Sequence, residues 1–380
     1  TVYGIGALIS AFSPGLGTLI LGNSILEGVG TALLIPPVYI LPTMLLRDLR
    51  SRAQAFGVIS GMGGIGAAAG PLIGGIITTG ISWRAAFVFQ AMIAAAIAIL
   101  ARRIVDPVPP DPTRPFDTLG AILSATGLLA LVMGILQADN NGVLMAVLLT
   151  VAALLLTLFF LHIRARERAG EEPLLSTELL RNRISNLALI TQNIQWLLLM
   201  GTAFVVSAFL QVVRGDNAIQ TGVIFTAATA GILVSSLAAE RLTKRHPQRT
   251  LIMAGFITTI TGIGVLLAMV KGQPSSWAFA PGLLLIGLGL GTMLTPSVNV
   301  VQSAFPQEQQ GEISGLSRSV SNLGSALGTA VAGTILVSGL TSPDRAYALA
   351  MIVLAVLGVI GLVATIFLPA DAAQQADRRH

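Results

Sequence analysis

Apolar runs long enough to cross a lipid bilayer recur along nearly the whole chain. The run from Leu144 to Leu161 contains no charged residue. A transmembrane α-helix needs about 20 apolar residues, because it rises about 1.5 Å per residue across a hydrocarbon core about 30 Å thick. Hydrophobic residues make up 54% of the 380 residues and charged residues only 10%, a balance that a water-soluble domain could not bury. We therefore expect the solvent of this fold to be lipid.

The apolar runs are expected to be helices. Only helices and closed barrels satisfy their backbone groups in lipid, and barrel strands would alternate polar and apolar residues over about 10 positions. These runs do not alternate. The sequence therefore predicts an all-α membrane protein with twelve spans, at residues 3–20, 24–46, 53–77, 84–103, 118–137, 143–163, 185–212, 217–239, 250–270, 277–299, 312–338 and 345–368.

Basic residues fall unequally on the loops between these spans. Seventeen of the 22 lysines and arginines lie in alternate loops and the tail, four lie in the other loops, and Arg318 lies inside a span. The excess of positive charge in cytoplasmic loops predicts that the first set of loops and both termini face the cytoplasm. The expected location is the plasma (cytoplasmic) membrane.

Three blocks are expected along the chain. Residues 1–103 hold four spans. Residues 104–184 hold a proline-rich linker, two very apolar spans and a charged loop with a short surface helix around Leu174–Leu180. Residues 185–380 hold six spans and a short tail. The chain opens at Thr1 and enters a span almost at once, so we expect two spans to be missing from its front.

Glycines in the expected third span form the most specific local pattern. Three of them recur every four residues and would form one smooth ridge, which lets a neighbouring helix approach closely. A proline in the same stretch removes a backbone donor and can bend the helix. The alternative is generic close packing of helices. The pattern comprises Gly57, Gly66, Gly70, Pro71, Gly74 and Gly75.

This spacing, followed by Trp83-Arg84, resembles the antiporter motif of major facilitator superfamily exporters. Other stretches are similar to the fourteen-span drug/proton antiporter branch, the EmrB/QacA type. They are Asn23–Gly30, Phe116–Gly120, Glu172–Leu175 and Ser236–Arg245. The resemblance implies a major facilitator fold in which about twelve of fourteen expected spans are present, with the first two spans and the main cytoplasmic motif absent.

The departures from the family pattern draw attention to Glu27. Where the family usually has a buried arginine in its fourth span this chain has Asn23, and the usual glutamine is Glu27. The family arginine is associated with proton coupling, so the resemblance leaves coupling by that route open. A carboxylate inside a membrane is costly and usually functional, which makes Glu27 a candidate proton carrier. The alternative is a glutamate wetted at the interface, about one turn inside the outer end of its span.

Polar residues in the last block add candidates for a proton or substrate pathway. Gln192 and Gln195 share a face with Trp196, which suits an amphipathic organic substrate in a mostly apolar pocket. The alternative is that this face packs against the two central spans. The other stripes would line a cavity or a gate, or would only hold the bundle together through hydrogen bonds between helices. Their members are Asn299 and Gln302 in one span, and Arg318 and Asn322 in the next.

A charged cluster follows the eighth expected span. It is either a cytoplasmic latch, whose ion pairs break as two halves of the protein rock, or a solvated basic loop. Its members are Glu240, Arg241, Lys244 and Arg245.

The sequence as a whole favours a secondary transporter rather than an enzyme. It contains no phosphate-binding glycine loop and no catalytic constellation, and without cysteine and with three scattered histidines it predicts no metal site. By resemblance, it would export drug-like or antibiotic-like molecules by alternating access, with a proton gradient as energy source and no cofactor. The expected partners are a small amphipathic organic substrate, protons and the lipid bilayer, with no nucleic acid. The alternatives are an uncoupled facilitator and a truncated, non-transporting membrane protein.

Overall fold

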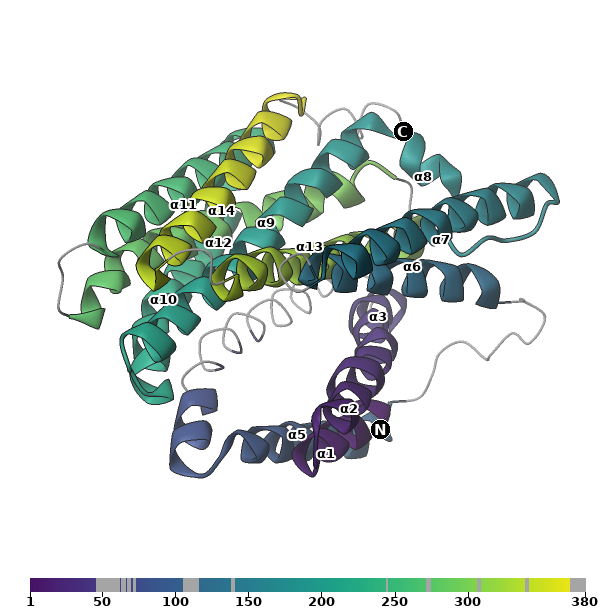
Figure 1. Cartoon of the computed structure of the whole chain (residues 1–380). Helices are drawn as coiled ribbons and strands as arrows, with labels where there is room; N and C mark the ends of the chain where they lie inside the picture. The colour runs from purple at the N-terminus through teal and green to yellow at the C-terminus, as the bar shows by residue number, and fades with distance from the viewer. Residues whose placement is uncertain are drawn as a thin grey trace. The chain divides into compact units, whose positions relative to one another are not determined.

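The structure is a computed structural model in which the chain divides into two compact units (Figure 1). One comprises Thr1–Pro112 with Asn217–Thr226, and the other comprises Thr113–Asp216 with Ala227–His380. The residues that the structure describes are 1–45, 62, 66, 70, 73–104, 116–137, 141–243, 245–270, 275–305, 309–338 and 342–369.

The first unit is built from helices that pack on the short helix α1. Its described helices are α1 (Val2–Ala11), α2 (Leu16–Leu19), the π-helix η1 (Ile20–Leu26), α3 (Glu27–Leu45), residues 73–80 and α5 (Trp83–Ala101). Helices α2, η1 and α3 follow one another without a break and form one long rod. Helix α1 contacts η1, α3 and α5, so it is the centre of this unit.

The first two spans differ from the prediction. A loop was expected at residues 21–23, but the chain turns at Phe12–Gly15, and the residues around Asn23 are helical. Pro14 has no N–H to donate and Gly15 is fully extended, so the helix ends there. Arg84 Nη2 donates to the Ser13 carbonyl oxygen at 3.0 Å and holds the turn. Helix α1 therefore ends at Ala11.

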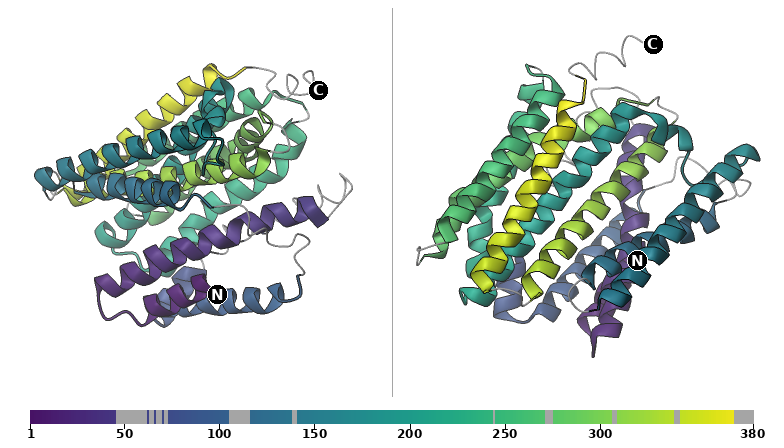
Figure 2. Two further views of the ribbon diagram at one scale, coloured as in Figure 1. Left: turned by 90° about the vertical axis from the view of Figure 1, so that its right-hand side faces the viewer. Right: turned by 45° about the horizontal axis from the view of Figure 1, so that its top comes forward.

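The second unit begins with the hairpin of α6 (Thr118–Leu136) and α7 (Gly142–Arg168), which lie side by side (Figure 2). The side chain of Asp117 caps α6 by accepting from Gly120 N, and Asn141 caps α7 by accepting from Leu144 N. The short surface helix expected near 174–180 is α8, at Thr177–Arg181.

Six long helices complete this unit, although residues 218–226 of one of them, α10, belong to the first unit. They and their short extensions are α9 (Arg183–Ala208), the π-helix η2 (Phe209–Val213), α10 (Ala218–Thr243), α11 (Gln248–Val270), the 3-10 helix η3 (Ser276–Phe279), α12 (Ala280–Gln302), α13 (Gln310–Val337) and α14 (Pro343–Ile366). Helix α9 is central and packs against α12, α13 and α14, while α11 packs against α12 and α14 (Figure 2).

Glycines set the spacing of several of these helix pairs. A Cβ built on Gly262 would lie 2.8 Å from the Gly282 carbonyl oxygen, and one on Gly255 would lie 2.7 Å from that of Gly289. Helices α11 and α12 therefore touch backbone to backbone. Small residues favour such contact in lipid, where burial of apolar side chains gives little drive for association.

The described residues contain ten helices long and apolar enough to cross a membrane, and the chain is a multi-pass, all-helical membrane protein. The spans predicted from residue 84 onward agree with these helices to within a few residues. The exception is α7, which runs five residues beyond the expected end at 163. Most of the third predicted span, 53–77, lies outside the described residues.

Candidate functional site

A buried carboxylate lies in the middle of the first unit. Glu27 is 6% exposed although it belongs to a candidate membrane span, Leu16–Ile35. Its carboxylate accepts a hydrogen bond from the Tyr3 hydroxyl, and Ser10 Oγ lies 3.5 Å from Oε1. The expectation that Glu27 sits one turn inside its span was wrong, because the helix begins at Leu16. At about 1.5 Å per residue, Glu27 is about 16 Å along it.

Glycines let the two helices close around this carboxylate. A Cβ on Gly6 would lie 2.7 Å from the Gly22 carbonyl oxygen and 2.8 Å from Glu27 N. Gly30 approaches the Tyr3 backbone still more closely. The close contact of α1 with η1 and α3 therefore leaves no room for larger side chains at these glycines, and it brings the Tyr3 and Ser10 hydroxyl groups to the carboxylate.

Asn23 does not join this cluster. Its side chain is exposed, whereas Glu27, four residues later, is buried. Residues four apart share a face of an α-helix, but Ile20–Leu26 is a π-helix with wider turns, so the two side chains diverge. Single π-helical turns occur frequently at functional sites, and this one ends immediately before Glu27.

A buried polar seam joins α9 to α13 in the second unit. Gln192 Nε2 donates to Ser321 Oγ at 2.9 Å, and Ser317 Oγ donates to Gln192 Oε1 at 3.0 Å. Asn193 Nδ2 donates to the Val320 carbonyl oxygen at 2.8 Å. These bonds tie Gln192 to α13, whereas the alternative to substrate contact for this residue was packing against the two central spans. The two serines were missed by the sequence analysis, which considered a different face of the same helix.

The other predicted pathway residues of this unit are dispersed. Gln195 is buried and donates to the Leu290 carbonyl oxygen at 3.4 Å, while its Oε1 has no hydrogen-bond partner in the part of the chain that the structure describes. Asn299 and Asn322 are exposed, and Gln302 is half-buried. The structure therefore does not bring the two polar stripes together as one cluster.

Arg318 stands beside the seam. It is half-buried within the candidate span Glu312–Val337, and its guanidinium carbon lies 5.7 Å from the centroid of the Trp196 ring. Its Nε is buried and has no hydrogen-bond partner among the described residues.

Asp117 is the hub of a charged cluster at the open end of the α6–α7 hairpin. Its Oδ1 lies 2.8 Å from His162 Nε2, its Oδ2 accepts from Leu174 N at 3.0 Å, and Arg166 Nε is 4.0 Å from Oδ2. Burial raises the pKa of the Asp117 carboxyl group, but hydrogen bonds from His162, Gly120 and Leu174 outweigh it and hold the net pKa below its ordinary value.

This cluster joins two stretches that were singled out separately in the sequence. The stretch Phe116–Gly120 supplies the carboxylate, and Glu172–Leu175 supplies the backbone N–H that it accepts from. The role of His162 was missed, although a histidine near the end of one span and an aspartate before the preceding span are a recognisable signal.

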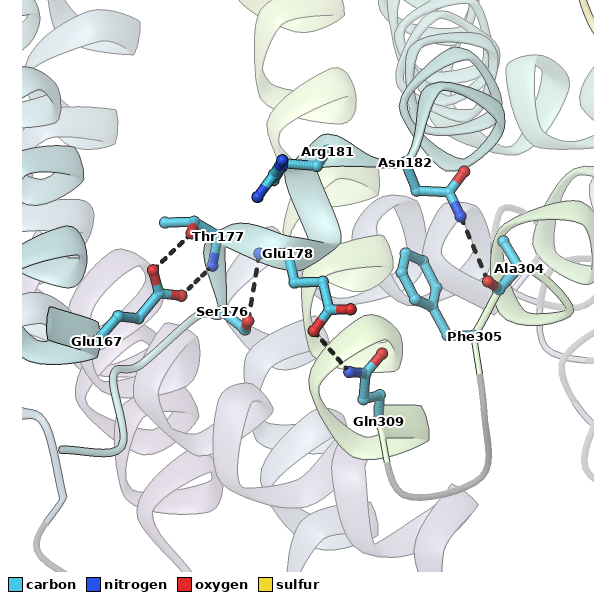
Figure 3. A pocket seen from close by; sticks show the side chains of 9 residues that line it. All are labelled: Glu167, Ser176, Thr177, Glu178, Arg181, Asn182, Ala304, Phe305 and Gln309. Carbon is cyan, nitrogen blue, oxygen red and sulfur yellow. Dashed lines mark hydrogen bonds between the residues drawn. The ribbon is translucent and has the colours of Figure 1, made fainter. Parts of the chain in front are cut away.

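A polar pocket of about 620 Å³ lies beside α8 (Figure 3). Glu167 accepts from the Thr177 hydroxyl and N–H groups, Gln309 donates to Glu178 at 3.4 Å, and the Asn182 amide donates to the Ala304 carbonyl oxygen. Its polar groups are therefore largely engaged with one another. The lining residues are Glu167, Ser176, Thr177, Glu178, Arg181, Asn182, Ala304, Phe305 and Gln309.

The glycine ridge and the predicted latch are only partly described. Gly66, Gly70 and Gly74 are helical, and no described atom lies within 4 Å of a Cβ built on them. Their packing against a neighbouring helix stays a prediction. A Cβ on the buried Gly75, in contrast, would lie 2.6 Å from the Ala218 carbonyl oxygen, so the start of α10 approaches the helix backbone there. Gly57 and Pro71 lie outside the described residues, as do Lys244 and the side chains of Glu240 and Arg241; Arg245 is exposed. The described residues contain no group of three acidic, histidine or cysteine side chains that could hold a metal ion.

Comparison with known proteins gives consistent matches over almost the whole chain. A family model described as Major Facilitator Superfamily matches residues 1–328 and, separately, 188–379. Puromycin resistance protein pur8 of Streptomyces alboniger is 29% identical over 88% of this chain and 66% of its own length. Multidrug resistance protein Stp of Mycobacterium tuberculosis is 26% identical over 90% and 63%. The chain thus spans about two thirds of the length of these curated relatives.

Solved structures match the fold. A transporter of the POT family in complex with 5-aminolevulinic acid has a TM-score of 0.64 at 15% identity, with 97% of this chain and 80% of that chain covered. The nucleoside transporter NupG has a TM-score of 0.59 at 13% identity, with 97% and 81% covered. At this identity the likeness concerns the arrangement of helices alone.

Proposed function

The chain belongs to the major facilitator superfamily of transporters, and on that premise we propose that it exports drug-like organic molecules in exchange for protons. Such a transporter exposes a central site alternately to the two sides of the membrane as two helical bundles rock. We infer further that the chain belongs to the fourteen-span drug/proton antiporter branch and that its basic loops face the cytoplasm.

The observation that carries proton coupling is the buried Glu27. An ionised carboxylate is costly in a low-dielectric environment, so such a group tends to be neutral unless hydrogen bonds or water stabilise the charge. The Tyr3 hydroxyl donates to the ionised form, and the Ser10 hydroxyl shares its hydrogen between the Gly6 carbonyl oxygen at 2.9 Å and Glu27 Oε1 at 3.5 Å. A rearrangement of α1 against η1 would remove or restore these donors. That change would make proton uptake depend on conformation, as exchange of protons for a substrate requires.

Drug export is favoured by the relatives. Pur8 is named for puromycin resistance and Stp for multidrug resistance, and LfrA of Mycolicibacterium smegmatis, 25% identical over 88% of this chain and 65% of its own length, is named as a multidrug efflux pump. At 25–29% identity these names support a substrate class rather than a substrate.

The test is transport in proteoliposomes with an imposed pH gradient. We expect purified protein to move at least one of two fluorescent probes, cationic ethidium and anionic fluorescein, against its concentration gradient. Glu27→Gln keeps the size of the side chain but removes the titrating proton, so it should abolish pH-driven movement in a protein that still folds. Asp344→Asn, which changes an exposed acid in the first turn of α14, is the matched control and should transport normally. Undiminished pH-driven transport by Glu27→Gln would remove this residue from the mechanism.

The second candidate function is an uncoupled facilitator, which the presence of Asn23 favours. The family arginine is absent at this position, and the Asn23 side chain points away from Glu27. An uncoupled protein would equilibrate both probes to equal concentrations on the two sides, whatever the pH gradient. A protein that moved neither probe, with or without the pH gradient, would support the remaining alternative, a membrane protein that does not transport.

A further inference from the structure

Arg318 is placed where a fixed positive charge is expensive. It lies eight residues into α13, about 12 Å along the helix at about 1.5 Å per residue, and inside the candidate span Glu312–Val337. Cationic side chains within membrane spans are rare, and they face a water-filled cavity or pair with an opposite charge.

No carboxylate of the described residues forms an ion pair with Arg318. The ion pairs found there join Asp117 to His162 and Arg166, and Arg166 to Glu171. The nearest acid along the helix, Glu312, instead accepts from Ser176 N at 3.4 Å.

The polar neighbours of Arg318 are also engaged elsewhere. Ser317 donates to Gln192, which in turn donates to Ser321, so this seam closes on itself. Arg318 Nε is left buried and without an acceptor. A buried donor without a partner is costly, and it is more costly when the group is charged. An anionic group placed against the guanidinium would supply the acceptor that this N–H lacks among the described residues.

Trp196 adds an aromatic surface to this charge. Its half-buried ring has its centroid 5.7 Å from the guanidinium carbon, within the range of a cation–π contact. A planar guanidinium suits bidentate binding of a carboxylate, sulfonate or phosphate, and an indole ring suits stacking with a flat aromatic ring. Both groups are presented by the adjacent helices α9 and α13.

We propose that Arg318 and Trp196 form a binding site for aromatic organic acids, in which the anionic group of the substrate pairs with the guanidinium and its ring packs on the indole. This inference rests on the proposed transport function and narrows its substrate class. The competing account is that Arg318 braces α13 against α9 through the cation–π contact alone. A brace needs no anion, so the two accounts differ in whether ligand charge matters.

The experiment measures equilibrium binding in nanodiscs without any gradient. Trp83 and Trp277 are replaced by phenylalanine, which leaves Trp196 as the single tryptophan and its fluorescence as the signal. The probes are benzoate, 2-naphthoate and anthracene-2-carboxylate, each matched with its uncharged primary amide. We expect the acids to bind at least about tenfold more tightly than the amides, since a charge-assisted hydrogen bond is worth about that factor or more.

Two variants locate the preference. Arg318→Gln should abolish the preference for acids and leave amide binding within about twofold, whereas Arg318→Lys should keep part of it. Two results obtained with Arg318 in place would overturn the proposal: equal binding of acids and amides, or acids that do not quench Trp196 at all. Neither result requires that Arg318→Gln folds. A preference for acids that persists in Arg318→Gln would overturn it as well.

The result is separable from the fate of the proposed function. If the pH gradient does not drive transport of ethidium or fluorescein while the aromatic acids still bind selectively, proton coupling is wrong and the binding site stands. If pH-driven movement succeeds while acids and amides bind alike, the transporter stands and the site is refuted.

Discussion

The close contact between α9 and α13 makes Gly328 sensitive to substitution. Gly324 and Gly328 lie one turn apart on α13, and a Cβ on either would come closer than 3.0 Å to a backbone carbonyl oxygen of α9, that of Asn193 or Leu197 respectively. Real Cβ atoms essentially never approach other atoms so closely. The obstacle is backbone rather than a flexible side chain, so Gly328→Ala can be accommodated only if the helices separate.

The cost follows from that separation. Ordinary contact needs 3.4–4 Å, so the Cβ and the carbonyl oxygen must move apart by about 1 Å or more, which would also stretch the 2.9 Å bond between Gln192 and Ser321. Overpacking of this kind typically costs about 1–3 kcal/mol of unfolding free energy. Two glycines of the same helix serve as controls. A Cβ on Gly333 would make ordinary contact with Phe204 at 3.6 Å, and one on Gly315 would meet nothing within 4 Å.

The assay is unfolding in mixed detergent micelles, followed by tryptophan fluorescence. Gly315→Ala should be neutral or stabilising by up to about 1 kcal/mol, because alanine is the better helix former. Gly333→Ala should be near neutral, and Gly328→Ala should lose about 1–3 kcal/mol. If the three variants proved equally stable, the backbone-to-backbone contact of α9 with α13 would be wrong.

Three further predictions concern single side chains. Asp117→Asn should lower the unfolding free energy by about 2–3 kcal/mol, because it removes charge-assisted hydrogen bonds to His162 and Leu174 N. Glu171→Gln, which alters an exposed ion pair, should cost less than about 1 kcal/mol. Equal losses would contradict the stabilising role of the Asp117 cluster. Because the folded pKa of Asp117 lies below its ordinary value, its contribution should be present above about pH 4 and disappear as the pH falls through the folded pKa, and an unfolding series against pH should show this dependence in the wild type but not in Asp117→Asn. Tyr347→Phe should be neutral or stabilising by up to about 1 kcal/mol in the same assay, because the buried Tyr347 hydroxyl has no hydrogen-bond partner among the described residues. A marked loss of stability would reveal a partner.

Hydropathy was sufficient to predict most of the spans, because a helix in lipid needs an uninterrupted run of apolar residues and such a run is recognisable in the sequence. It failed at the first turn for the same reason. Ser13-Pro14-Gly15 interrupts an apolar run without adding charge, so the break was sought further on, near Asn23. The helix there adopts π geometry, which no apolar period reveals.

Candidate polar residues could be found from sequence, but their partners could not. The buried Glu27 was identified, whereas Tyr3 and Ser10, which bind it, look like ordinary members of an apolar helix. Rotation of α13 about its own axis turns Ser317 and Ser321 toward Gln192 and leaves Asn322 exposed. That rotation depends on which glycines meet the neighbouring backbone, and a single sequence does not tell which helices are neighbours.

The length of α7 ties this protein to the thickness of its bilayer. Its 27 residues extend about 40 Å at about 1.5 Å per residue, about 10 Å more than an average hydrocarbon core. The surplus must be taken up by tilt or by projection into water, and the last turn, with Arg166 and Arg168, favours projection at that end. A thicker membrane would draw His162 and Asp117 toward the acyl chains, and a thinner one would leave them among the headgroups. The acyl-chain length of the host lipid therefore determines how far water reaches the cluster around Asp117.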